Sequence, residues 1–217
     1  MAEPVRRWPE STRVEAFSDG VLAIAVTLLV LDLHSDFESG DFAHAIAAQW
    51  PSYVAYLSAF LNVSAIWINH HDLFTRVVGV DAGLVTVNLA LLLVASLFPW
   101  PAAVVSASQR GGDRGDQITA DLLYAGIGFL VPLTFIAICT YLARSPHLLV
   151  DRDTGYVRVL RRRSLVSIVV YPVTAALAFV SPDLALALFL ALPLFFIASV
   201  FVQERADVFV QERAGSP

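Results

Sequence analysis

Three ionisable side chains interrupt stretches of sequence that are otherwise apolar, and these are the places where chemistry could occur. Asp19 lies near the start of one apolar run, and His70 and His71 follow the end of another. Ionisable groups at membrane depth are costly to bury, so they often mark ion pathways or proton relays. A relay through Asp19, His70 and His71 is one hypothesis, and it predicts a proton- or ion-coupled transporter. The alternative is that Asp19 only locks its helix against its neighbours.

Metal binding and enzymatic chemistry find less support. The run His70-His71-Asp72 contains metal-ligand side chains, but adjacent residues of a helix point to different faces. The lone cysteine, Cys139, lies in an apolar run and predicts a small buried hydrophobe. The sequence contains no HExxH, GxSxG or phosphate-cradling glycine loop. We therefore expect no fixed metal, no cofactor and no enzymatic activity; a non-conducting membrane assembly protein stays an alternative.

The composition predicts a membrane protein. Of 217 residues, 57% are hydrophobic and 15% are charged, whereas soluble domains carry about a quarter charged residues. A bilayer core of roughly 30 Å needs about 20 apolar residues per helix, so six spans would use nearly all of the chain. We expect an all-α fold with one six-helix domain over residues 1–217. The six expected helices are Phe17–Leu33, Trp50–Ile68, Ala82–Ala107, Ala120–Leu142, Leu165–Val180 and Leu184–Val202.

Polar and proline-containing segments separate or bend these helices. A polar segment, Asn69–Asp72, follows the second helix, and we expect loops at Gln109–Gln117 and Arg144–Arg163, because charged residues gather there. The run Pro99-Trp100-Pro101 should bend the third helix, since proline lacks the N–H that a helix interior needs. Pro132 lies inside the fourth.

The arginines predict the orientation. If the N-terminus is cytoplasmic, twelve of the fourteen arginines lie inside and only Arg110 and Arg114 lie outside. This is the bias expected of a membrane protein, and it places the N-terminus (1–12) and the tail (203–217) in the cytoplasm. No basic stripe with interleaved aromatic residues is present, so we expect no nucleic-acid partner.

The first helix carries an apolar stripe. Ile24, Thr27, Leu28 and Leu31 follow the i, i+3, i+4, i+7 spacing of one helix face. Three branched apolar side chains can form a narrow constriction that gates by dewetting, and the Thr27 hydroxyl can offer an oxygen to a partly dehydrated cation. By periodicity alone, the stripe fits any membrane helix equally well.

A motif in the first helix resembles a known family. Phe17-Ser18-Asp19-Gly20, preceded by Arg13 and followed by Ala23–Leu28, is similar to the signature of the endolysosomal potassium channel family, and most of all to its bacterial homologues. Trp67-Ile68-Asn69-His70-His71 is also similar to that family. The resemblance implies a passive cation channel that prefers potassium to sodium and lacks a carbonyl filter loop. A single six-helix repeat implies a homotetramer with four copies of the first helix around the pore.

The resemblance also implies roles for particular residues. Ile24 would form the narrowest ring, with Thr27, Leu28 and Leu31 also lining the pore and permeant potassium passing near Thr27. A second set would brace the pore helices and neighbouring subunits: Arg13, Phe17, Ser18, Asp19, Trp67, Asn69, His70 and His71. The implied partners are potassium ions, the lipid bilayer of a bacterial plasma membrane and other copies of this chain.

Overall fold

The secondary structure of the described residues is helical, which confirms the all-α part of the predicted fold. The computed structural model describes residues 11–33, 41–194 and 197–198. The helices are α1 (Ser11–Leu28), η1 (Leu29–Asp32), α2 (Phe42–Ala48), α3 (Trp50–Phe74), α4 (Ala82–Ser96), α5 (Pro99–Gly111), α6 (Arg114–Arg144), η2 (Pro146–Leu148), η3 (Val150–Arg152) and α7 (Gly155–Ala178). A further apolar helix, Pro182–Leu194, follows α7.

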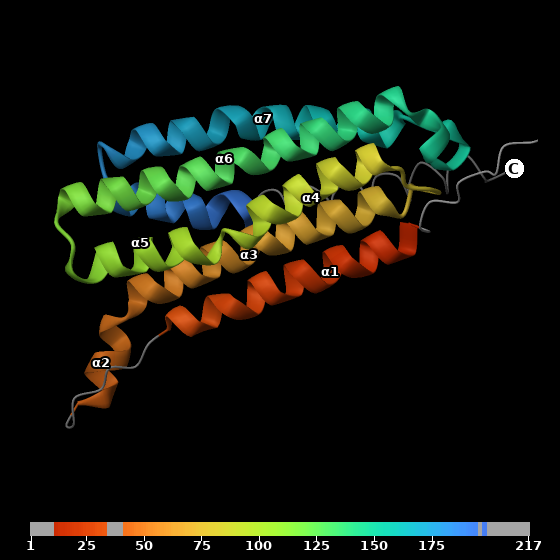
Figure 1. The fold of residues 1–217 in the computed structure, drawn as a ribbon. Helices are drawn as coiled ribbons and strands as arrows, with labels where there is room; N and C mark the ends of the chain where they lie inside the picture. The colour runs from red at the N-terminus through yellow and green to blue at the C-terminus, as the bar shows by residue number, and fades with distance from the viewer. Residues whose placement is uncertain (1–10, 34–40, 195–196, 199–217) are drawn as a thin grey trace, which may run out of the picture.

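The long helices lie with their axes roughly parallel in one elongated bundle (Figure 1). α4 and α5 follow each other in one direction, and otherwise consecutive long helices run in alternating directions. α6 and α7 lie side by side along one edge, α1 lies along the opposite edge, and α3, α4 and α5 lie between them. The start of α1, the end of α3 and the start of α7 meet at one end of the bundle. Arg110 and Arg114 lie at the other end, where Arg114 donates hydrogen bonds to the backbone oxygens of Phe179 and Val180.

Four of the described segments are long and apolar enough to cross a membrane: Ser11–Asp32, Trp50–Phe74, Ala82–Gly111 and Arg114–Arg144. The remaining two predicted spans differ from these, because α7 carries arginines in its first half and Pro182–Leu194 is shorter. The predicted continuation of the last helix to Val202, residues 1–10 and the tail 203–217 lie outside the described residues.

Three polar stretches that lie outside the predicted helices, two of which we expected to be loops, are largely helical. Asn69–Asp72 belongs to α3, which continues to Phe74, and Arg158–Arg163 belongs to α7, which begins at Gly155. Both helices extend beyond their apolar runs, and the start of α7 is favoured because arginine is a good helix former. The link between α5 and α6, within Gln109–Gln117, is short. The Asp113 carboxylate accepts the backbone N–H groups of Gly115 and Asp116, and this cap allows α6 to begin at Arg114.

Proline divides the third predicted helix, as expected. α4 ends at Ser96 and α5 begins at Pro99, because a proline ring clashes with the preceding turn and leaves a carbonyl without its donor. Pro132 remains inside α6. The short helix α2 was not predicted; the Asp41 carboxylate caps it by accepting the N–H of His44 at 3.1 Å.

Two backbone hydrogen bonds, which we call the clasp, join the α3–α4 link to the α6–α7 link. The N–H of Val78 donates to the carbonyl of Leu148 at 2.8 Å, and the N–H of Val150 donates to the carbonyl of Arg76 at 2.9 Å. These bonds join two segments that are far apart in sequence. They hold the ends of α3 and α6 together at the end of the bundle where α1 begins.

Side chains reinforce the same clasp. The Arg76 guanidinium lies 3.9 Å from the centre of the Tyr156 ring, and the Tyr156 hydroxyl donates to the Asp72 carboxylate at 3.2 Å. Burial raises the pKa of the Tyr156 hydroxyl, and the negative charge of Asp72 raises it further. Tyr156 is thus a neutral donor at any physiological pH, and it fixes the start of α7 to the end of α3.

Candidate functional site

A buried hydrogen-bond chain joins α1, α3 and α4. The Asn88 side-chain N–H group donates to the Ser18 hydroxyl at 2.9 Å, and the Asn88 carbonyl oxygen lies 2.9 Å from Nε2 of His70. The exposed fractions of Ser18, Asn88 and His70 are 0%, 1% and 1%. Since an amide oxygen can only accept, His70 must carry its proton on Nε2. If His70 is neutral, this contact selects the tautomer that is protonated on Nε2.

Both ends of this chain are held in place. The Ser18 hydroxyl donates to the backbone oxygen of Val14 at 2.8 Å, one turn earlier in α1. The His70 ring stacks on Phe74 with the ring centres 4.2 Å apart. The sequence reasoning missed Asn88, although a single amide in the apolar run of α4 is the kind of residue that membrane helices use to bind one another. This polar chain sets the rotation of α1 relative to α3 and α4.

A second contact between α1 and α3 lies at the surface of the bundle. The indole N–H of Trp67 donates to the Asp19 carboxylate at 2.9 Å, and the Trp67 ring stacks on His71 with the ring centres 5.5 Å apart. Asp19, Trp67 and His71 are all exposed. No hydrogen bond among the described residues joins Asp19 to His70 or His71. The three predicted relay residues are thus divided between a buried chain and a surface contact.

The remaining motif residues occupy different surroundings. Arg13 and Phe17 are exposed on the first turns of α1. The Asn69 side-chain N–H group donates to the backbone oxygen of Ala65 at 2.7 Å, and Asn69 is half-buried. Asn69 therefore faces the interior of its own subunit in part, whereas Arg13 and Phe17 face outward.

The predicted apolar stripe lies on the uncovered face of α1. Ile24, Leu28 and Leu31 are 60%, 44% and 64% exposed, and Thr27 is exposed beside them. The opposite face packs into the bundle through Ser18, Leu22, Ala25 and Leu29, which are all buried. The neighbouring helices are α3 and α4 along α1, joined by α5 toward η1.

The backbone conformation of η1 keeps the stripe on one face, and Thr27 carries its one hydroxyl. The chain tightens into a 3₁₀-helix at Leu29–Asp32, where residues three apart lie in line, so Leu31 stays on the same face as Leu28. The Thr27 hydroxyl donates to the backbone oxygen of Ile24 at 2.9 Å. This bond uses the hydroxyl proton and leaves the oxygen lone pairs available to accept or to face a cation.

Small residues lie on the same uncovered face. No atom lies within 4 Å of the position that a Cβ would take at Gly20, and Ala23 is exposed. Ala25, a third small residue of α1, is buried and packs within its own subunit. Gly20 and Ala23 thus leave room for another helix to approach α1 closely.

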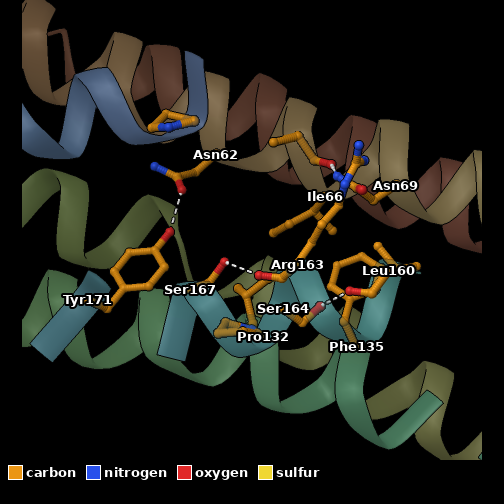
Figure 2. A pocket seen from close by; sticks show the side chains of 13 residues that line it. Asn62, Ile66, Asn69, Pro132, Phe135, Leu160, Arg163, Ser164, Ser167 and Tyr171 are labelled. Atoms are coloured by element: carbon orange, nitrogen blue, oxygen red, sulfur yellow. Dashed lines mark hydrogen bonds between the residues drawn. The ribbon is translucent and has the colours of Figure 1, made fainter. Parts of the chain in front are cut away.

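A separate cavity of about 70 Å³ lies inside the subunit, between α3, α6, α7 and the helix Pro182–Leu194 (Figure 2). The Tyr171 hydroxyl donates to the Asn62 side-chain oxygen at 2.8 Å, and the Asn62 N–H group donates to Ser58 and Tyr124. The Ser164 hydroxyl donates to a backbone oxygen of its own helix. A cavity of this size holds a few water molecules.

An all-α bundle with several membrane-length helices places the chain among helical membrane proteins. Sequence comparison identifies a family within this class. A profile of the family described as endosomal/lysosomal potassium channel TMEM175 matches residues 13–99. A Streptomyces collinus protein named as a potassium channel is 42% identical, over 82% of this chain and 87% of its own length. The chain therefore belongs to the TMEM175 family, which is a family of ion channels and not of enzymes.

Further relatives and solved structures agree with this assignment. A Chamaesiphon minutus protein named as a potassium channel is 31% identical, over 86% of this chain and 93% of its own length. The human endosomal/lysosomal proton channel TMEM175 is 33% identical, over 59% of this chain and 27% of its own length. The crystal structure of a potassium-selective TMEM175 homologue from Chamaesiphon minutus matches with a TM-score of 0.74 and 28% identity, over 87% of this chain and 97% of that one.

Proposed function

We propose that the chain is one subunit of a homotetrameric, potassium-preferring channel, in which four copies of α1 surround a central pore. The observation that carries the proposal is the uncovered stripe of α1, where Ile24, Thr27, Leu28 and Leu31 face away from the subunit's own core. One helix cannot enclose a water-filled path, so the other walls must come from symmetry-related copies. Family membership supports conduction, because the bacterial relatives are named as potassium channels.

The stripe suits a hydrophobic constriction. In a fourfold assembly, Ile24 would present a ring of four branched apolar side chains, and such a ring blocks ions when it dewets. Thr27 lies about one turn further along α1, and its free lone pairs would contact a permeant cation. Leu28 and Leu31 would continue the pore wall toward the η1 end.

The buried chain of Ser18, Asn88 and His70 would give the pore its support. It fixes α1 against α3 and α4 from the side opposite the stripe. The exposed contact between Asp19 and Trp67 lies at the edge of that face, where the next subunit would pack. Arg13 and Phe17 are exposed beside it and would take part in the same subunit contact.

The proposed topology has six spans, with α7 and the helix beginning at Pro182 as the last two. One end of the bundle carries Arg13, Arg76, Arg144 and the arginines of η3 and α7, and the other carries Arg110 and Arg114. The positive-inside bias then places the first end, and both chain termini, in the cytoplasm of a bacterial cell.

Flux from purified protein tests the constriction. We expect Ile24→Asn to raise potassium flux into liposomes and to reduce the preference over sodium, because the amide wets the ring. Leu133→Asn is the matched control, since Leu133 is 39% exposed on α6, which lies along the opposite edge of the bundle. A proton-sensitive dye should be read in the same vesicles, because animal relatives are named as proton channels. Equal potassium flux in wild type and Ile24→Asn would reject the assignment of Ile24.

Cross-linking tests the assembly separately. Cys139 is the lone cysteine and is buried, so a Cys139→Ala background permits single surface cysteines. Ile24→Cys should form covalent dimers under mild oxidation, because copies of α1 meet at the pore axis. Leu133→Cys should not form them. A protein that stays monomeric in membranes with Ile24→Cys would contradict the tetramer, whatever its flux.

The transporter hypothesis is not favoured by the geometry. His70 is bound to Asn88 in the interior, while His71 stacks on Trp67 at the surface. A proton passing from Asp19 to His70 would need a rearrangement of both contacts. Flux that saturates and runs against a gradient would nevertheless support a transporter over a channel.

A further inference from the structure

The first half of α7 carries an unpaired basic face. Arg158, Arg161 and Arg162 are exposed and lie within about one turn of one another. None of the three forms a hydrogen bond or an ion pair with a described residue. Of the acidic residues near the start of α7, Asp153 accepts the N–H of Gly155, Asp72 accepts the Tyr156 hydroxyl, and Asp151 is exposed on η3. Three close positive charges without a counter-ion favour binding of an anion.

The same helix face continues as an apolar stripe. Leu165, Val166, Val169 and Val173 follow the arginines at spacings of three or four residues, and each is at least half exposed. α7 lies along the edge of the bundle opposite α1, so this helix stands away from the helix that lines the proposed pore (Figure 1). The face therefore has two parts in order along one axis, a basic end and an apolar stem.

The dimensions match one leaflet of a bilayer. From Arg162 to Val173 the helix rises about 16 Å. Half of the hydrocarbon core is about 15 Å thick. An apolar stem of this length under a cluster of guanidinium groups matches a phospholipid, whose acyl chains lie below its phosphate. Guanidinium groups also bind phosphate oxygens in pairs, which a point charge cannot do.

We propose that this face of α7 binds an anionic phospholipid of the inner leaflet. The phosphate of the headgroup contacts Arg158, Arg161 and Arg162, and an acyl chain lies along Leu165, Val166 and Val169. An acidic protein segment would bind the arginines but would leave the adjoining stem without an apolar partner. The inference requires α7 to stand in the membrane with its first half at the cytoplasmic surface. It does not require that the pore conduct.

Native mass spectrometry of detergent-solubilised protein tests the site. The full chain is titrated with dioleoyl phosphatidylglycerol, with dioleoyl phosphatidylcholine, and with glycerol phosphate, which has the charge but no acyl chain. We expect the wild type to retain phosphatidylglycerol and to bind the other two much more weakly. The triple variant Arg158→Gln, Arg161→Gln, Arg162→Gln should lose most of this binding. Arg110→Gln, which removes an exposed arginine at the opposite end, should bind like the wild type.

Each single substitution should lower the affinity for phosphatidylglycerol by about five-fold, from the gain that one basic side chain makes near an anionic surface. The single variants also carry the test if the triple variant does not fold. Phosphatidylglycerol binding that is unchanged in the folded variants would overturn the proposal, as would equal binding of glycerol phosphate. Because bound lipid is counted directly, a chain that binds lipid but conducts nothing would reject the channel and not this site.

Discussion

Replacing Asn88 should show how much the buried polar chain contributes to stability. Asn88→Leu keeps most of the side-chain volume but removes both the acceptor for His70 and the donor to Ser18. The Nε2–H group of His70 is then left in an interior where only 1% of the residue is exposed. The Ser18 hydroxyl keeps its bond to the Val14 carbonyl, so only one group is stranded.

The expected loss follows from these contacts. A stranded buried donor costs about 1–3 kcal/mol. A lost hydrogen bond between membrane helices adds about 0.6 kcal/mol. We therefore expect Asn88→Leu to lower the free energy of unfolding by about 2–3 kcal/mol, which changes the ratio of folded to unfolded protein by more than tenfold.

A double substitution separates the cost of leaving the His70 donor without a partner from the cost of losing one hydrogen bond. In the double variant His70→Phe, Asn88→Leu, no donor is stranded, and the new ring can keep the stacking on Phe74. Replacing both partners by apolar groups is often nearly neutral, so the double variant should recover most of the lost stability. Thr86→Val is the matched control, since Thr86 is exposed on the same helix and its hydroxyl only contacts the Ala82 carbonyl.

Equilibrium unfolding in mixed micelles, at constant protein concentration, measures these differences. Potassium flux should be recorded for the same variants, because a loosened α1 should disturb the proposed pore. An Asn88→Leu variant as stable as the Thr86→Val control would refute the reasoning. A double variant whose losses simply add would also refute it, since it would show that His70 and Asn88 are not coupled.

Two further substitutions probe packing and charge. Gly128→Ala should lower the free energy of unfolding by about 1–3 kcal/mol, because a Cβ there would overlap the Tyr171 ring. Gly126→Ala is the control, since that position lies in open space on the same helix, and it should raise the stability slightly. Thermal unfolding of both variants measures the difference. Burial opposes the charge of Asp81, but a backbone N–H and the Tyr141 hydroxyl outweigh it and lower the pKa of that carboxyl below its usual 3.8. Asp81→Ala should therefore cost about 1 kcal/mol at neutral pH, as a lost helix cap does. The difference from wild type should shrink as the pH falls below about 4 in a pH series of melting temperatures, because protonation removes the same charge–dipole contact; a constant difference would contradict it.

The apolar runs of the sequence were sufficient to predict an all-α membrane protein and the approximate place of every long helix. Helix periodicity also placed Ile24, Thr27, Leu28 and Leu31 on one face, because side-chain direction along a helix depends only on residue spacing. Helix ends were less predictable. α3 and α7 extend through polar residues outside the apolar runs. Polar side chains are compatible with a helix whose adjoining apolar segment already packs against other helices.

The partners of the polar residues were decided only by tertiary structure. Sequence spacing could not show that Asp19 receives its hydrogen bond from Trp67 and not from a histidine. Nor could it connect Ser18 with Asn88, which lie 70 residues apart in the chain. Periodicity states which residues share a face, but not which neighbouring helix covers that face or at what rotation. That choice depends on how all the helices pack together, and it separates the buried face of α1 from the one it leaves uncovered.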